Sequence, residues 1–553
     1  MNLVKKHVSE TKALINENSK DCSSLNNIAE WILNIGYYPE PYVVPPCFKV
    51  SGFKLLDSRI ENKNYDDNWE SKKLVNISFP KTGLVQRTFG IIHPEIYHDI
   101  VRELISNWND LMDHLFNDQN EIYSYSFPIS IPKRDGSKLR SGRMIYEFLE
   151  MSEKDLSAEA YKYKLLTKID ITNFYNSVYT HSISWAWVGD RYEALKDSKT
   201  FIQLGTKLDK LFQYANDRRT NGVAVGPVLS DIIVEIILAE RDKVITRKLK
   251  ELKIDFLATR FKDDYRFLCQ SENDSKKIIR TVIEVLNEFN LQVNEKKTSV
   301  ELLPESLYRK HSLKYETYSL REKFKSKNIP FKVFENTYLK TLQIHREFLG
   351  TSILEKFLGE LIDNDTSKKL YKRLKIDFEN INIPKESSNY EKVRRQNIKK
   401  GISLLLILKN ESSKTLSKVL SIIECLISNP ENEWLINENY IFNIFLSEME
   451  NAILNSSAFE LIWLIYFTEK HGLSIDITRL TKNLKKEGKI NKTENELEVL
   501  KNPFVATIRN KMPGKGSFPN PFGEETLTTK IFTPIKDLGE INLIDYLDVF
   551  RRE

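Results

Sequence analysis

Two adjacent carboxylates, Asp263 and Asp264, lie between two runs of β-forming residues that extend from Phe256 to Cys269. Apolar and aromatic residues on both sides of a polar turn predict a β-hairpin with the acids at its tip. Acids held this close repel each other unless cations neutralise them, so the pair indicates a divalent-metal site. For an acid pair alone, a solvated hairpin tip is the alternative.

A third acid follows another predicted strand. Residues 161–169 are typical of a buried strand, which delivers Asp170 at its end. Metal ions clamped by acids from two neighbouring strands activate an attacking hydroxyl and stabilise a leaving pyrophosphate, as in two-metal nucleotidyl transfer. We therefore predict that Asp170, Asp263 and Asp264 are catalytic and bind metal, and we add Ile171 to the candidate metal ligands.

The composition is that of an ordinary soluble protein. The chain has 553 residues, of which 41% are hydrophobic, and this length suffices for several domains. A net charge of +6 arises from 83 basic and 77 acidic residues, a balance that permits a local nucleic-acid channel. The four cysteines have no partner at metal-ligand spacing, so we expect buried thiols in a reducing compartment.

The sequence shows no pattern that directs a protein into a membrane. The first ten residues lack the apolar core of a signal peptide, and the best apolar segments, residues 402–408 and 461–467, are too short to span a bilayer. We therefore expect a cytoplasmic protein with no membrane partner.

Proline and tyrosine mark a segment near the N-terminus. Residues 1–35 have a helical pattern that strengthens towards its end. Residues 36–47 then contain four prolines and three tyrosines, which are incompatible with a regular helix. We expect this second segment to be extended and to pack over a neighbouring surface.

Basic residues crowd a second predicted hairpin at residues 127–143, whose turn signal is Asp135-Gly136. Their side chains suit phosphate oxygens, and an exposed basic turn is the alternative. The basic residues are Lys133, Arg134, Lys138, Arg140 and Arg143.

Two glycines, Gly222 and Gly226, lie in a short loop before Pro227, which we expect to open a helix. Glycines of this kind let the backbone come close to a base pair or a template strand. Downstream, the apolar spacing of Ile278, Val282, Val285 and Leu286 predicts an amphipathic helix.

Beyond about residue 310 the pattern becomes helical, and polar breaks indicate stacked antiparallel helix pairs without a strict repeat period. The tail is rich in proline and glycine, and we expect its apolar–acidic end, residues 541–550, to dock back on the body of the protein. The predicted helical stretches are residues 331–362, 366–380, 388–409, 413–428 and 432–470.

Four segments occur in the order of the palm motifs of reverse transcriptases, and together they resemble that family most closely in its bacterial defence-associated, abortive-infection (AbiK-like) group. The resemblance covers roughly residues 120–310. It has departures, because Ala224 stands where many members have proline, Phe261 replaces the usual tyrosine, and Lys262 adds a cation beside the acids. The segments are Asp170-Ile-Thr-Asn-Phe-Tyr175, Asn221-Gly-Val-Ala-Val-Gly-Pro-Val-Leu-Ser230, Phe261-Lys-Asp-Asp264 and Asn294-Glu-Lys-Lys-Thr298.

The resemblance implies an α+β fold, with a right-hand-type polymerase palm and fingers followed by an all-α, helical-repeat-like C-terminal domain. It divides the chain into four parts. These are an N-terminal extension with the start of the fingers (1–125), the fingers and palm (126–310), the helical domain (311–500) and a Pro/Gly-rich tail (501–553).

The resemblance also implies a nucleotide site with Mg²⁺ or Mn²⁺ as cofactor. Lys133, Arg140 and Arg143 would bind the triphosphate of the incoming dNTP, and Lys297 would lie near the pyrophosphate. Gly226 would contact the nucleotide or template. Tyr175 stands at the position of the steric gate, where a ring under the sugar clashes with a 2′-hydroxyl and favours deoxynucleotides.

The function implied is DNA synthesis from dNTPs in defence against phage, in a bacterial homo-oligomer that releases single-stranded DNA. Some members of the group need no template, while others copy a non-coding RNA. Some attach the first nucleotide to a tyrosine, for which Tyr37, Tyr38 and Tyr42 are candidates. The alternatives are a retron- or intron-type reverse transcriptase and a catalytically silent, nucleic-acid-binding assembly protein.

Overall fold

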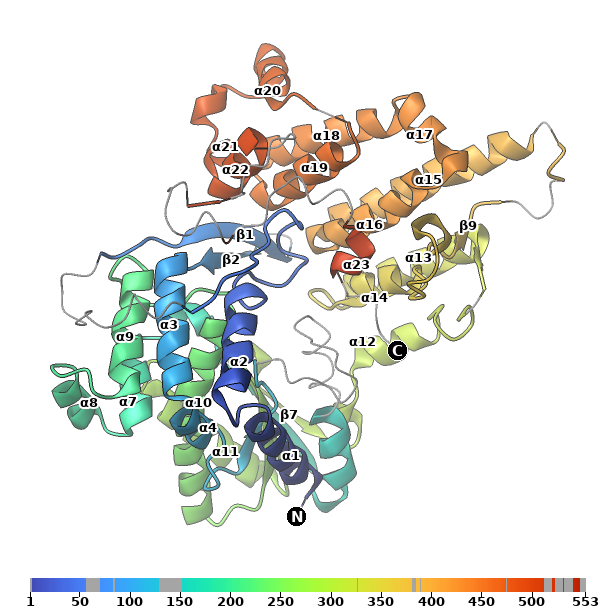
Figure 1. The fold of residues 1–553 in the computed structure, drawn as a ribbon. Helices are drawn as coiled ribbons and strands as arrows, with labels where there is room; N and C mark the ends of the chain where they lie inside the picture. The colour runs from blue at the N-terminus through green and yellow to red at the C-terminus, as the bar shows by residue number, and fades with distance from the viewer. Residues whose placement is uncertain are drawn as a thin grey trace.

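Helices and a small central sheet make up this computed structural model (Figure 1), which bears out the predicted mixture of helix and strand. It describes residues 2–55, 70–82, 85–128, 152–325, 327–379, 384–387, 389–473, 475–511, 520–522, 531 and 541–547. The predicted hairpin at residues 127–143 therefore lies almost entirely outside the described residues.

A five-stranded sheet holds the predicted acids, and its strand order is β3-β5-β6-β4-β7. Strands β5 and β6 form the predicted hairpin, in which Phe261 is opposite Asp264. Strand β4 pairs antiparallel with both β6 and β7, whereas β3 pairs parallel with β5. The strands are β3 (Ile122–Ser124), β4 (Leu165–Asp170), β5 (Leu257–Phe261), β6 (Asp264–Cys269) and β7 (Ser299–Leu302).

Two helices that contact each other, α10 (Val228–Glu251) and α11 (Glu272–Asn287), support this sheet. Pro227 is the N-cap of α10, as predicted. The four apolar residues that predicted an amphipathic helix are fully buried on α11. The other α-helices given for residues 94–215 are α3 (Pro94–Ser106), α4 (Trp108–Leu115), α6 (Phe174–Ser177), α7 (His181–Val188), α8 (Arg191–Asp197) and α9 (Leu204–Ala215).

The N-terminal helical region is two helices, α1 (Leu3–Glu17) and α2 (Cys22–Asn34). The break has a local cause, because the Asp21 side chain accepts a hydrogen bond from the Ser24 N–H and begins a new helix. A further hairpin of β1 (Val75–Thr82) and β2 (Val85–Ile91), which the sequence pattern did not indicate, follows.

Residues 36–47 form the expected irregular strap, which joins segments far apart in the chain. The Trp463 indole donates to the Val43 carbonyl at 3.3 Å, and the Tyr546 hydroxyl donates to the Val44 carbonyl at 3.0 Å. One continuous hydrophobic core accordingly includes residues from Ile15 to Leu547.

The part beyond residue 310 is mostly helical, but three predicted stretches differ, of which 331–362 is two helices. Residues 366–380 contain no α-helix where they are described, because Asp365 accepts from the Ser367 N–H and the Lys375 N–H bonds to the Leu361 carbonyl. The stretch at 432–470 is three helices. The helices are α12 (Lys310–Glu316), α13 (Phe331–Glu347), α14 (Ile353–Glu360), α15 (Tyr390–Glu411), α16 (Leu416–Ile427), α17 (Trp434–Asn437), α18 (Tyr440–Leu454), α19 (Ala458–Lys470), α20 (Ile477–Lys486), α21 (Glu498–Lys501) and α22 (Pro503–Lys511).

The short strands β8 (Ile329–Pro330) and β9 (Ile376–Asp377) also belong to this part. The predicted repeat-like arrangement and the four domain boundaries stay predictions. Of the four free cysteines, three are buried as expected, but Cys22 is exposed at the start of α2. None of the described helices combines the length and the apolar character that a bilayer crossing requires.

The tail docks back on the body as expected, through α23 (Leu543–Leu547), which lies beside α16 in Figure 1. The carboxylate of Glu424 on α16 accepts the Leu543 N–H at 2.7 Å and pairs with Lys470. Burial would raise the pKa of Glu424, but the hydrogen bonds from His471, Lys470 and Leu543 hold it below its ordinary value.

Replacing Glu424 with alanine will therefore loosen the tail. The change leaves Lys470 buried without its partner, so we expect the free energy of unfolding to fall by about 3 kcal/mol. Urea unfolding measures this loss, and hydrogen exchange will show faster exchange at residues 541–547. Glu498→Ala is the matched control, since that side chain is 76% exposed and should matter little. Equal stability of the two variants would contradict the expectation.

Candidate active site

Strand pairing brings the three predicted acids together at one end of the sheet. Asp170, the last residue of β4, lies opposite Asp264, the first residue of β6. Asp263 is in the turn between β5 and β6, and its carbonyl accepts the Ile171 N–H at 3.2 Å. The structure thus places all four predicted metal-site residues next to one another.

Burial and the neighbouring acids raise the pKa values of Asp263 and Asp264. Burial, then repulsion by Asp263 and Asp170 and a hydrogen bond with Asp170, raise the pKa of Asp264 to about 7. Burial and repulsion by Asp170 likewise raise the pKa of Asp263. Protein atoms crowd the carboxyl of Asp264, although the residue as a whole reaches the molecular surface, whereas Asp170 is 6% exposed.

Lys297 places a cation against this group, and its position near a pyrophosphate stays a prediction. It lies in the turn before β7, and its Nζ is 2.8 Å from Asp170 Oδ2. Burial alone would lower the pKa of Lys297, but the carboxylates of Asp170, Asp264 and Asp263 raise it. The ammonium therefore stays charged and offsets part of the negative charge.

The donors fit a hard divalent cation such as Mg²⁺ or Mn²⁺, because all three side chains offer carboxylate oxygens. Burial and mutual repulsion raise the pKa values of Asp263 and Asp264, and such a cation would relieve that repulsion. As they are oriented, however, no three or more His, Cys, Asp or Glu side chains among the described residues form a ready metal site. The Ile171 side chain is apolar and buried.

Tyr175, the predicted steric gate, is connected to Lys262 through a shared contact with Asp231. Its hydroxyl donates to Asp231 on α10, and Lys262 Nζ donates to the same carboxylate oxygen at 3.0 Å. The ammonium of Lys262 therefore binds Asp231 and not one of the three predicted metal-binding acids. Its charge lowers the pKa of Asp263, but burial and Asp170 raise that pKa by more.

Gly226 has a packing role that the sequence did not reveal. Its φ of 121° is unfavourable for other residues. A Cβ at this position would lie 2.9 Å from Phe89 on β2 and from Pro39 in the strap. The glycine therefore lets the loop pass close under these two residues, and its predicted contact with nucleotide stays a prediction.

The other predicted binding residues have mixed outcomes. Lys133, Arg140 and Arg143 lie outside the described residues. Tyr37 is fully buried and its hydroxyl donates to the Ile92 carbonyl at 2.7 Å, and Tyr38 is 6% exposed. The structure thus speaks against these two as priming residues, because neither hydroxyl is accessible to a nucleotide. Tyr42 is partly exposed, and its ring packs on Phe79.

His181 has a structural role in the helices beside the sheet. Its Nδ1 lies 2.6 Å from Asp209 Oδ2, which links α7 to α9. The hydrogen bond with Asp209 raises the pKa of His181, so this contact favours the protonated imidazole.

A buried ion network behind the hairpin was missed in the sequence. Arg260 on β5, 1% exposed, donates to Asp242 at 2.8 Å and to Glu235 at 2.9 Å, and also to the Lys262 carbonyl at 3.2 Å. Burial raises the pKa of Asp242 to about 6, although Arg260 and Tyr265 lower it. The signal was two acids among the apolar residues that begin α10, Asp231 and Glu235, with Asp242 two turns further along.

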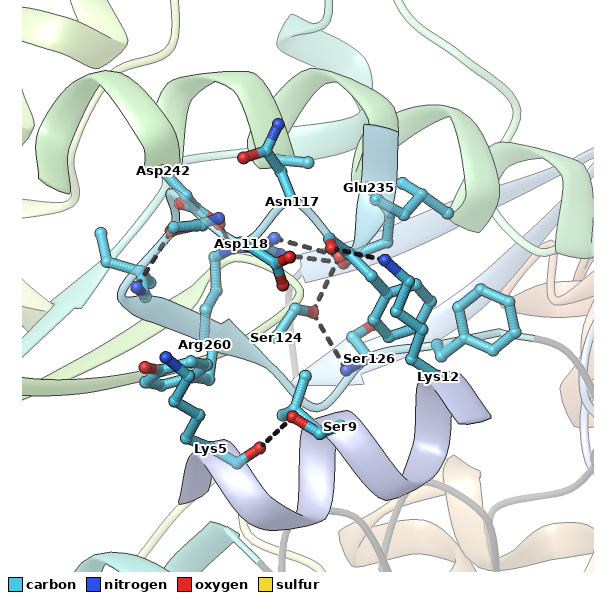
Figure 2. Close-up of a pocket in the computed structure, with 18 residues that line it drawn as sticks. Lys5, Ser9, Lys12, Asn117, Asp118, Ser124, Ser126, Glu235, Asp242 and Arg260 are labelled. Carbon is cyan, nitrogen blue, oxygen red and sulfur yellow. Dashed lines mark hydrogen bonds and ion pairs between the residues drawn. The ribbon is translucent and has the colours of Figure 1, made fainter. Parts of the chain in front are cut away.

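The cavity in Figure 2 is separate from the three aspartates. Glu235, Asp242 and Arg260 form its base, and Lys5 and Lys12 of α1 line it from the other side. Ser124 donates to Glu235 there at 2.8 Å. Because Arg260 is already paired with Glu235 and Asp242, we assign this side of the cavity to the support of the sheet.

A comparison of the chain with models of known protein families finds the family that the four sequence segments resemble. Residues 113–351 match the model of the reverse transcriptase (RNA-dependent DNA polymerase) family, which supports a reverse transcriptase. No curated protein matches the chain.

Solved structures with some likeness include two telomerases. The apo telomerase of Candida tropicalis is 11% identical, with a TM-score of 0.31 over 66% of this chain and 67% of that one. The telomerase of Candida albicans, in complex with a TWJ fragment of telomeric RNA, is 14% identical, with a TM-score of 0.26 over 66% of this chain and 64% of that one. Because these TM-scores are low, we draw no conclusion from them.

The raised pKa of Asp264 predicts a dependence of stability on pH. Without metal, the folded state holds a proton that the unfolded state releases between pH 3.8 and about 7. Over that range the melting temperature of the wild type, relative to that of Asp264→Asn, should fall as the pH rises. Thermal unfolding in EDTA measures the difference. Added Mg²⁺ should restore stability most at pH 8, where the carboxylates are charged. A pH-independent difference would contradict the expectation.

Proposed function

We propose that this protein is a DNA polymerase of the reverse-transcriptase type, which makes DNA from dNTPs by two-metal nucleotidyl transfer. The observation that carries the proposal is the meeting of Asp170, Asp263 and Asp264 at one end of the sheet, with Lys297 against them. The match of residues 113–351 to the reverse transcriptase family supports the same reaction.

Asp170, Asp263 and Asp264 would hold Mg²⁺ or Mn²⁺, which when bound supplies Lewis acidity to the attacking hydroxyl and the phosphate oxygens. The chain's own groups do the rest. The ammonium of Lys297 neutralises or protonates the leaving pyrophosphate. The ring of Tyr175 excludes a 2′-hydroxyl, and Lys133, Arg140 and Arg143 bind the triphosphate of the dNTP.

We further propose that this polymerase acts in the cytoplasm of a bacterium, in abortive infection. It would synthesise single-stranded DNA without a template. It would do so as a homo-oligomer whose C-terminal helical domain is repeat-like. This part of the proposal rests on the resemblance of the four segments to AbiK-like enzymes. Copying of an associated non-coding RNA is the alternative, and a silent assembly protein is the alternative from another class.

Removing one acid tests the reaction. Asp263→Asn should reduce incorporation of labelled dNTP by about 100-fold or more, because several kcal/mol of charge stabilisation are lost and 1.4 kcal/mol is about tenfold. Asp113→Asn is the matched control, since this acid on α4 has a side chain that is 80% exposed. Incorporation that survives in Asp263→Asn would overturn the proposal. An inactive wild type, with Mg²⁺ or Mn²⁺ and with or without RNA, would favour the silent protein.

Priming is tested by separating the product before and after protease treatment. If synthesis begins on the protein, label stays attached to protein after denaturation and is released as free DNA by protease. Tyr42→Phe should then abolish attachment, whereas Tyr37→Phe should not, because Tyr37 is buried. Product that is free before protease treatment would exclude protein priming. Synthesis that depends on added RNA would favour the templated alternative.

A further inference from the structure

Three segments of the candidate active site meet at one side chain, Asp231. It lies in the first turn of α10, and one of its carboxylate oxygens accepts both the Tyr175 hydroxyl and the Lys262 ammonium, the latter at 3.0 Å. Lys262 Nζ also lies 5.9 Å from the centre of the Tyr175 ring. Asp231 therefore links Tyr175 of α6 to the turn between β5 and β6.

The contacts of Asp231 with Tyr175 and Lys262 are partly shielded from water, which therefore competes little for the same hydrogen bonds. The side chain of Asp231 is 17% exposed and that of Lys262 is 24% exposed. Hydrogen bonds to a charged group are stronger than those between neutral groups, and partial burial reduces the screening by water. Burial and the nearby carboxylate raise the pKa of Tyr175, so its hydroxyl stays protonated and donates.

The turn that carries Asp263 is held at both its side chain and its backbone. Lys262 has a φ of 53°, a conformation that costs energy in a residue with a Cβ. Its ammonium bonds to Asp231, and its carbonyl accepts from Arg260 at 3.2 Å. The two contacts together stabilise this turn conformation.

We propose that Asp231 is a positioning residue that sets the preference for deoxynucleotides, by holding the Tyr175 ring and the Lys262 turn in one fixed relation. This inference rests on the proposed function, in which Tyr175 lies under the sugar. A ring tethered by its hydroxyl cannot swing away from a 2′-hydroxyl, whereas an untethered ring yields. Loss of the tether therefore admits ribonucleotides without removing any metal-binding acid.

The test compares incorporation of dTTP and UTP, with Mg²⁺ or Mn²⁺, on poly(rA) primed with oligo(dT) and without template. Asp231→Ala should lower the dTTP preference about tenfold, which corresponds to about 1.4 kcal/mol. Asp231→Asn keeps an acceptor for Tyr175 and should lower it less. Tyr175→Phe removes the tethered hydroxyl and should lower it as well. Because these two changes break one shared contact, the double variant Tyr175→Phe/Asp231→Ala should lose less than the product of the single losses.

Two controls separate positioning from general damage. Glu240→Gln alters another acid of α10, which pairs with Lys243, and Tyr192→Phe removes the hydroxyl of a residue that is 75% exposed. Both should keep the wild-type preference. Circular dichroism checks that each variant folds, and if Asp231→Ala does not fold, Asp231→Asn and Tyr175→Phe decide.

Two different failures are distinguishable. Folded, active Asp231 and Tyr175→Phe variants with the wild-type preference would overturn the positioning role but leave the polymerase intact. A wild type that incorporates neither nucleotide, in any of these conditions, would overturn the proposed function and this inference with it. A wild type that uses dTTP and UTP equally would overturn the inference alone.

Discussion

The buried guanidinium of Arg260 is the interaction on which the rest of the site depends. A charge with 1% exposure is tolerated only when it is paired and fully hydrogen-bonded. Asp242 and Glu235 supply that pairing from α10, which fixes the helix against β5. The same guanidinium binds the Lys262 carbonyl, so the ion network that attaches the helix also supports the turn with Asp263.

The order of the strands explains why the acids and the lysine come together. Strand β4 lies between β6 and β7, so that its last residue, Asp170, is next to Asp264 on one side. On the other side the chain enters β7 directly after Lys297, which brings its ammonium to Asp170. The sheet thus creates a crowded anionic group and one compensating cation, an arrangement that a divalent cation completes.

Contacts between distant segments hold this sheet within the whole protein. The strap at residues 36–47 binds α19 and α23 through its carbonyls, and α23 is in turn attached to Glu424 of α16. Gly226 passes beneath the strap and β2, which joins the loop before α10 to the N-terminal part. The helical C-terminal part and the sheet therefore both contribute residues to one hydrophobic core.

The sequence by itself determined the local features. Alternation and turn residues placed the hairpin and its two acids, a buried run placed Asp170, and Pro227 placed the start of α10, because these depend on neighbours in the chain. Only the tertiary structure decided what depends on distant partners. Burial keeps the hydroxyls of Tyr37 and Tyr38 away from a nucleotide. Hydrogen bonds to polar side chains and a short strand pair replace the helix expected at 366–380. The acids of α10 were recognised as important only from their contacts, since Asp231 binds Lys262 while Glu235 and Asp242 bind Arg260. The spacing of residues along a helix does not show which side chain of another element each one will contact, because tertiary packing determines those contacts.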